Sequence, residues 1–194
     1  MSMFCFQCQE AAGGKGCSKV GVCGKAPEVA NLQDLLIFVL KGYSEYNQQA
    51  RAAGLNDPKN DRFLIESLFA TITNANFDKK VFEGRVQKAL EIRDAVKDTL
   101  VKAGKLADKP YKDSAIWNGS VDQFDLKAAS PEVGVLATQN EDVRSLRELV
   151  IYGLKGMAAY AEHALNLGYD DAETIAFIEK ALAATEDDTL DAGA

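Results

Sequence analysis

Apolar residues recur at helical spacing along most of the chain. The first such stretch begins near Pro27, which suits the first turn of a helix, and runs to Gly54. Its apolar positions are Leu32, Leu35, Leu36, Val39, Leu40 and Tyr43. Steps of three and four residues place these side chains on one face, so the pattern predicts a long amphipathic helix.

Two further helices are predicted before residue 105. After a turn, Asn60 or Asp61 is expected to cap a second helix, because short polar side chains accept hydrogen bonds from the first free N–H groups. Asp78 is expected to cap a third long helix, which ends at Gly104. Residues 27–104 are therefore predicted to form a three-helix bundle.

The periodicity fails over residues 105–139, which contain two prolines and an Asn-Gly pair. Apolar residues such as Trp117 are too frequent there for a free linker. We expect an irregular segment that packs over the helices and covers the cysteine-rich loop described below. Helical spacing resumes after Asn140 and again from Asp171, and the whole pattern predicts an all-α fold.

An internal repeat organises these helices. Residues 32–42 and 146–156 match in apolar pattern and in the placement of charges. The first copy continues into a third helix near Asp78, whereas the equivalent position in the second copy is Asp191, close to the last residue. We predict two three-helix-bundle-like repeats, the second of which, residues 140–194, lacks its third helix. The apolar groove left open is expected to bind the remaining domains of a longer chain or a second copy.

Composition and charge narrow the functional classes. The chain has 194 residues, 47% of them apolar, which is enough for a substantial core. It has no apolar run long enough to cross a membrane, and no signal-peptide region fits before the first cysteine, so we expect a cytoplasmic protein. A net charge of -7 argues against nucleic-acid binding. The first 25 residues are instead locally basic, with Lys15, Lys19 and Lys25 against Glu10.

All four cysteines lie in the glycine-rich stretch of residues 1–26, which we interpret as a metal-binding loop. They are Cys5, Cys8, Cys17 and Cys23, with the spacing Cys-x2-Cys-x8-Cys-x5-Cys. Cysteines gathered so closely are expected to meet at one point instead of stapling distant parts of the fold.

Three kinds of site are open to such a set of thiols. A disulfide framework needs an oxidising compartment, which nothing in the sequence indicates. Structural zinc sites usually have two close cysteine pairs, and only one is present here. One pair followed by two single cysteines among flexible glycines suits an iron–sulfur cluster, whose irons each accept a thiolate. We favour the cluster, with zinc and thiol chemistry as the alternatives.

The sequence at and beyond these cysteines resembles the N-terminal region of the hybrid cluster protein family, also called hydroxylamine reductases. The resemblance covers nearly the whole chain. The strings that carry it are MFCFQCQE at residues 3–10, GVCGK at 21–25, FATITNANF at 69–77, LATQNEDVRSLREL at 136–149 and GLKGMAAYAEH at 153–163.

The resemblance implies a cofactor and a function. Family members with this cysteine spacing carry a [4Fe-4S] cluster, so the match implies that Cys5, Cys8, Cys17 and Cys23 are its ligands. The family reduces hydroxylamine at a second, mixed oxygen–sulfur iron cluster in later domains, whose cysteine ligands have no counterpart after Cys23. His163 does not match that cluster's histidine, and we expect it to have a packing or surface role.

We therefore expect an iron–sulfur electron-transfer domain of an oxidoreductase, fed by a redox donor protein, with no catalytic residue of its own. The alternative is a structural or assembly module, in which the metal site folds the loop and the open groove binds a partner chain. A complete small redox sensor is a third reading.

Overall fold

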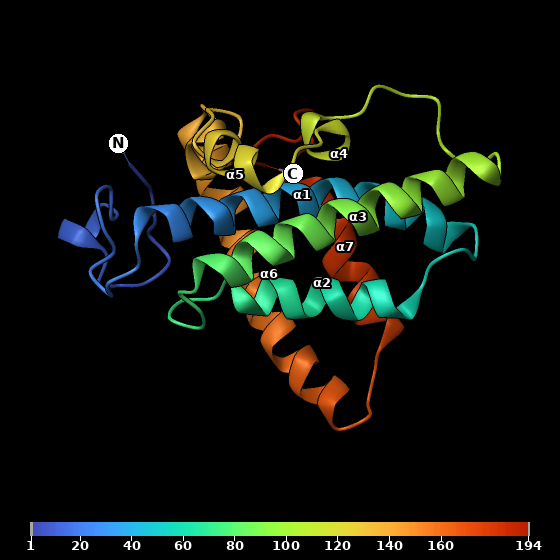
Figure 1. The fold of residues 1–194 in the computed structure, drawn as a ribbon, viewed down its shortest axis with the longest axis horizontal. Helices are drawn as coiled ribbons and strands as arrows, with labels where there is room; N and C mark the ends of the chain where they lie inside the picture. The colour runs from blue at the N-terminus through green and yellow to red at the C-terminus, as the bar shows by residue number, and fades with distance from the viewer. Residues whose placement is uncertain (1, 194) are drawn as a thin grey trace.

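The computed structural model describes residues 2–193, and within that range the chain forms helices and no strand (Figure 1). The long helices are α1 (Pro27–Ala52), α2 (Pro58–Ala70), α3 (Lys79–Lys102), α6 (Glu141–Asn166) and α7 (Ala172–Ala184). The short ones are α4 (Asp113–Ile116), α5 (Val121–Ala128) and the 3-10 turns η1 (Ala12–Gly14) and η2 (Val135–Ala137). The predicted all-α fold is confirmed. Met1 and Ala194, the outer limits of the first and last predicted segments, lie outside the described residues.

The start of α2 differs from the prediction. Neither Asn60 nor Asp61 caps this helix; the Asp57 carboxylate accepts a hydrogen bond from the Lys59 N–H at 2.9 Å. Pro58 is then the first helical residue, a position where the missing N–H costs nothing. The turn predicted before the helix therefore supplies both its cap and its first residue.

The segment expected to be irregular contains α4 and α5, and both pack on α1. Helices of four and eight residues complete too few turns to give a recognisable period, so the sequence pattern did not predict them. The segment is fastened to α3 by Arg93, which is almost fully buried and donates a hydrogen bond to the Ser114 carbonyl at 2.9 Å. The segment of residues 105–139 therefore packs over α1, as expected from its apolar residues.

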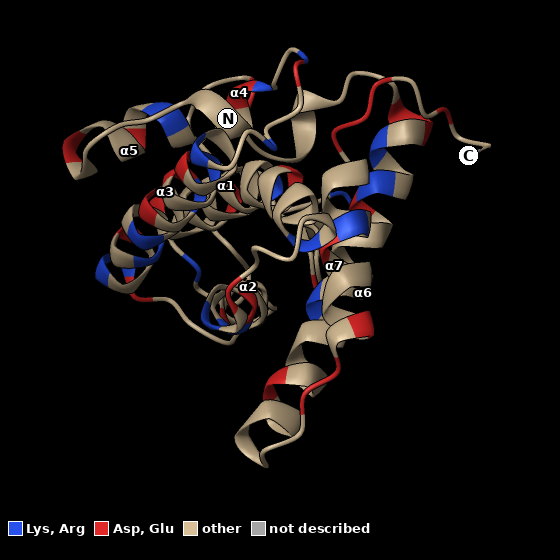
Figure 2. Ribbon diagram, turned by 90° about the vertical axis from the view of Figure 1, so that its right-hand side faces the viewer, with Lys and Arg blue, Asp and Glu red and all other residues tan. Residues whose placement is uncertain are grey.

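Helix α1 lies at the centre of the molecule. It packs closely on α3 and α7 as well as on the two short helices, while α2 packs mainly on α6 (Figure 1). Its core positions include Leu32, Leu35, Leu36 and Val39, all fully buried. The far end of α6 and its turn into α7 project from this body (Figures 1 and 2).

The helix lengths agree with the predicted repeat. Helices α1 and α6 have 26 residues each, and α2 and α7 have 13 each. Gly54 and Gly168, which follow the two long helices, both have positive φ, at 70° and 84°. The division into two bundles stays a prediction. In the structure α2 packs on α6 and α1 packs on α7, so helices from the two halves of the chain are paired with each other.

A buried polar network joins α1, α2 and α7. The fully buried Glu179 carboxylate of α7 accepts hydrogen bonds from Arg51 of α1 at 3.0 and 3.1 Å. It also accepts one from Asn47 at 2.6 Å, and Arg51 forms an ion pair with Asp61 of α2 at 2.8 Å. One guanidinium therefore holds carboxylates from two other helices.

Replacing the central carboxylate should destabilise the fold. In Glu179→Ala, Arg51 keeps only Asp61, and a buried guanidinium loses part of its compensation. We expect the free energy of unfolding, measured by urea denaturation, to fall by about 3 kcal/mol. Glu91→Ala, an exposed position on α3, should change it by less than about 0.5 kcal/mol. Equal losses in both variants would contradict the role given to the network.

Candidate metal centre

The cysteine-rich loop folds back on itself through its backbone. The Cys5 N–H donates to the Cys17 carbonyl at 3.0 Å, and the Cys17 N–H donates to the Cys5 carbonyl at 2.7 Å. Ser2 extends this contact with a bond to the Ser18 carbonyl. The first and third cysteines are therefore held opposite each other by peptide groups alone.

Two glycines let the loop close. Gly16 has a φ of 113°, and a Cβ there would lie 2.9 Å from the Phe4 ring. A Cβ on Gly21 would lie 3.0 Å from the Cys23 sulfur and 3.1 Å from Lys25 Cβ. Larger residues at these positions would push apart the groups that surround the thiols.

The four cysteines are free and differ in exposure. Cys17 is buried, Cys5 and Cys8 are half-buried and Cys23 is exposed. The Cys17 sulfur accepts a hydrogen bond from the Val22 N–H at 3.5 Å.

The donor set fits a cluster better than a single ion. Among residues 2–193, no three His, Cys, Asp or Glu side chains come together as the ligands of one metal ion do. One zinc ion needs its thiolates at about 2.3 Å, whereas a cluster binds each thiolate on a different iron and so spreads them. Four free thiols on one closed loop meet this need in number and type, and their assignment as ligands stays a prediction.

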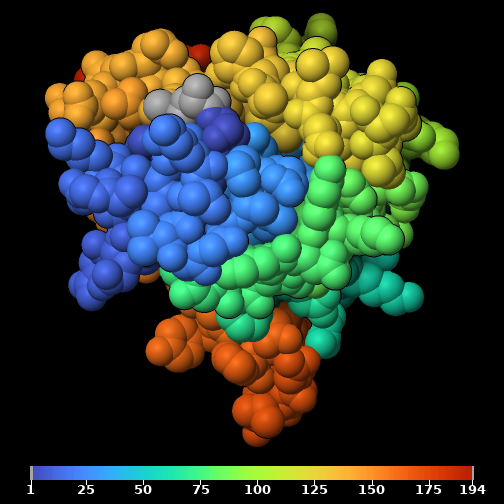
Figure 3. Space-filling model, turned by 60° about the vertical axis from the view of Figure 1, so that its left-hand side comes forward, coloured from blue at the N-terminus to red at the C-terminus, as the bar shows by residue number. Residues whose placement is uncertain are grey.

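The loop is anchored on the first turns of α1. Asn31 donates a hydrogen bond to the Ser2 carbonyl at 2.9 Å, and Lys25 donates one to the Gln33 side chain at 2.6 Å. Lys25 is almost fully buried, and it lines the same cavity as Cys5 and Cys8. Figure 3 shows the loop on one side of the molecule, bordered by the start of α6 and by the segment around α5.

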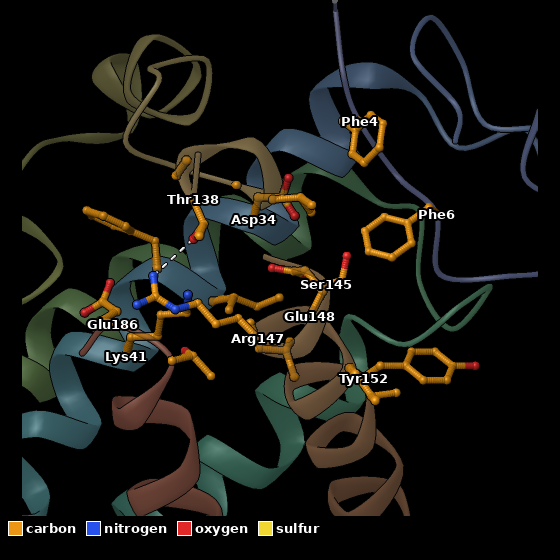
Figure 4. A pocket seen from close by; sticks show the side chains of 18 of the residues that line it. Phe4, Phe6, Asp34, Lys41, Thr138, Ser145, Arg147, Glu148, Tyr152 and Glu186 are labelled. Carbon is orange, nitrogen blue, oxygen red and sulfur yellow. Dashed lines mark hydrogen bonds between the residues drawn. The ribbon is translucent and has the colours of Figure 1, made fainter. Parts of the chain in front are cut away.

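A cavity of about 1080 Å³ adjoins the loop. Its walls come from the loop itself, from α1, from the segment before α6 and from the first half of α6 (Figure 4). Cys5, Cys8, Phe4 and Phe6 line one side. The centroids of the two aromatic rings lie 5.6 Å apart, and Figure 4 shows both rings at the edge of the cavity.

Two of those charged side chains have strongly shifted pKa values. Burial raises the pKa of Asp34 to about 7, although Lys155 partly offsets this. Burial lowers the pKa of Lys155 to about 8, and the negative charge of Asp34 opposes that change. The Glu148 pKa is also raised by burial. The cavity therefore holds groups that titrate near neutral pH.

These groups were not found by sequence reasoning. Within residues 2–193, Glu148 forms no ion pair within 4.0 Å, and its neighbour Arg147 binds Asp188 at 3.2 Å. Lys155 did leave a signal, because it occupies a position on the buried face of α6, beside Ile151 and Leu154. A lysine on an apolar face indicates either a covered charge or a polar cavity.

His163 has the packing or surface role expected of it. The side chain is exposed on α6, and its ring lies 5.9 Å from the Phe69 ring of α2, between centroids.

Comparison with known proteins gives the family. The model of the Prismane/CO dehydrogenase family matches residues 3–193. The chain belongs to this family. A hydroxylamine reductase of Desulfitobacterium hafniense (strain Y51) is 58% identical over 193 residues, and one of Clostridium botulinum (strain Kyoto / Type A2) is 53% identical over 215.

These family relatives are much longer than this chain. Each alignment covers 99% of the chain but only 35% of the Desulfitobacterium protein and 38% of the Clostridium protein. Within residues 2–193, no helix combines the length and the apolar character needed to cross a membrane.

The space around Gly21 makes a test of the loop. In Gly21→Ala the new methyl group crowds the Cys23 sulfur and Lys25, so we expect iron bound after anaerobic reconstitution to fall at least several-fold. Gly84→Ala on α3 meets open space and should bind as much iron as the parent chain. Iron content is measured by a colorimetric assay, with helix content checked by circular dichroism. Full iron binding by Gly21→Ala would show that the close contact of Gly21 with Cys23 and Lys25 is not needed for iron binding.

Proposed function

We propose that this chain is an electron-transfer domain that binds a [4Fe-4S] cluster through Cys5, Cys8, Cys17 and Cys23. The observation that carries the proposal is the set of four free thiols on one backbone-closed loop. Its support from the family is that Prismane-type proteins bind iron–sulfur clusters. The four-iron form rests on the family resemblance, in which members with this cysteine spacing carry a [4Fe-4S] cluster.

When bound, such a cluster accepts and releases one electron. The chain's own residues set the conditions for this. The Val22 N–H and the buried Lys25 ammonium favour negative charge on the sulfurs, which stabilises the reduced form. Phe4 and Phe6 line the cavity beside Cys5 and Cys8, and in this proposal their rings reduce the access of water to the cluster.

The reaction that uses these electrons belongs, in this proposal, outside the chain. The relatives are named hydroxylamine reductases, and this chain has no cysteine after Cys23 to hold a second cluster. We propose that it receives electrons from a redox donor protein in the cytoplasm and has no catalytic centre. Isolated, it should not reduce hydroxylamine.

Anaerobic purification followed by metal analysis distinguishes an electron-transfer domain from a structural zinc module and from a catalytic domain. We expect about four irons and four sulfides per chain, an EPR signal on reduction, and no hydroxylamine consumption by the reduced chain. Cys17→Ser should remove most of the iron, whereas Ser18→Ala, its neighbour without a ligand role, should not. Zinc without any redox signal would favour the structural alternative, and turnover of hydroxylamine would contradict the absence of a catalytic centre.

The alternative function, docking of a partner chain, is favoured by a separate observation. Apolar side chains form an exposed stripe along α6 and the residue that follows it, which we call the α6 stripe: Leu146, Leu149, Val150, Tyr160 and Leu167. Exposed fractions reach 66% at Leu149 and 82% at Tyr160. Stripes of this kind mark interaction sites. Because the relatives extend well beyond the matched region, we propose that the occupant is the remainder of such a longer chain.

Charge placed on the α6 stripe should abolish this docking. The chain should co-purify with a separately expressed remainder of the Desulfitobacterium relative, and the double variant Leu149→Lys, Tyr160→Lys should not. Leu126→Lys, an equally exposed apolar position on α5, serves as the control and should retain binding. Self-association of the chain that is lost in the double variant would instead favour a second copy.

A further inference from the structure

The cavity beside the cysteine loop contains two ionisable groups that electron transfer alone does not use. Asp34 comes from α1 and Lys155 from α6, and both line the cavity with Cys5. Lys155 is only 3% exposed, and its ammonium has one hydrogen bond, a long one of 3.4 Å to the Thr71 carbonyl. Within residues 2–193, the Asp34 carboxylate has no ion pair within 4.0 Å and no hydrogen bond. Lys155 is buried and Asp34 half-buried, and charges so weakly compensated are costly, which favours a change of protonation state.

Charges of both signs surround this pair. The charged groups that face Asp34 are Lys155, Glu148, Lys25 and Lys41. Those that face Lys155 are Asp34, Glu148, Lys25 and Cys5. Negative charge at Cys5 raises the pKa of Lys155, so the pair responds to the charge carried by the cysteine loop.

We propose that Asp34 and Lys155 form a proton-binding pair that takes up a proton when the cluster held by the cysteine loop gains an electron. This proposal rests on the proposed function, since it needs a reducible cluster at Cys5. An external one-electron carrier protein supplies the electron, and the solvent in the cavity supplies the proton. The only new bond is O–H on Asp34 or N–H on Lys155, and the proton leaves when the electron does.

The protonation states of the pair give the sign of the effect. Below about pH 7 both groups are protonated, between about pH 7 and 8 both are charged, and above about pH 8 only the carboxylate is charged. The net charge of the pair thus falls from +1 to -1 as pH rises. Added negative charge on the loop favours the protonated forms, so reduction becomes harder as pH rises across this range.

The test is a spectroelectrochemical titration of the cluster-loaded full chain, with redox mediators, at a series of pH values. We expect the midpoint potential to fall between about pH 6 and 9 and to level off outside that range. The slope should stay below about 59 mV per pH unit, the value for a tenfold change in proton activity with one proton per electron. A midpoint potential that does not vary with pH would overturn the proposal.

Substitutions assign the effect to the pair. Asp34→Asn and Lys155→Met, which keeps the apolar stem, should each leave a single step. Because each group offsets the other's pKa shift, the remaining Lys155 step should move to lower pH in Asp34→Asn, and the remaining Asp34 step to higher pH in Lys155→Met. The double variant keeps the pair's net charge at zero and should show a flat potential. Glu91→Gln removes a carboxylate at an exposed position on α3, and this variant should behave as the parent chain. A slope that persists in the double variant overturns the proposal.

A second measurement does not depend on the cluster. Carbon-13 NMR of the same chain without reductant should show Asp34 titrating near pH 7, and titration near pH 4 would overturn the proposal while leaving electron transfer intact. A chain with no reducible signal at all would overturn the proposed function and this inference together.

Discussion

The structure depends on the burial of α1 on nearly every side. A helix covered in this way has no solvent face on which to place polar side chains, so each one needs a partner or a cavity. At its C-terminal half Arg51 and Asn47 hold Glu179 and thereby fix α7. At its N-terminal half Asp34 has no such partner and borders a cavity. The same constraint therefore produces a rigid junction at one end and a titratable site at the other.

The polar groups of the cysteine loop also need hydrogen-bond partners, but here they are the peptide groups of the backbone. It lacks regular secondary structure, so its peptide groups need partners of their own. The reciprocal bonds between Cys5 and Cys17 and the anchor from Asn31 supply them. The loop therefore reaches a defined position at the start of α1, with the cavity on its flank.

Local patterns predicted most of the fold. The apolar periods and the Asp78 and Gly104 signals placed the long helices, because these features act within one or two turns. The four cysteines were equally visible as a set. Asp34 and Lys155 were not, because their significance comes from the approach of α6 to α1, two segments far apart in the chain. Packing of α2 on α6 across the repeat was hidden for the same reason.

The contact between Cys5 and Cys17 is made by main-chain atoms. The shape of the loop therefore depends on the backbone, whereas metal binding depends on the side chains. The two peptide hydrogen bonds place no demand on the side chains that leave the same residues. A substitution that keeps the size of the side chain, such as serine at the buried Cys17, should therefore leave the contact that shapes the loop in place. The backbone thus holds the loop in shape, and the side chains at the same positions determine which metal the loop prefers.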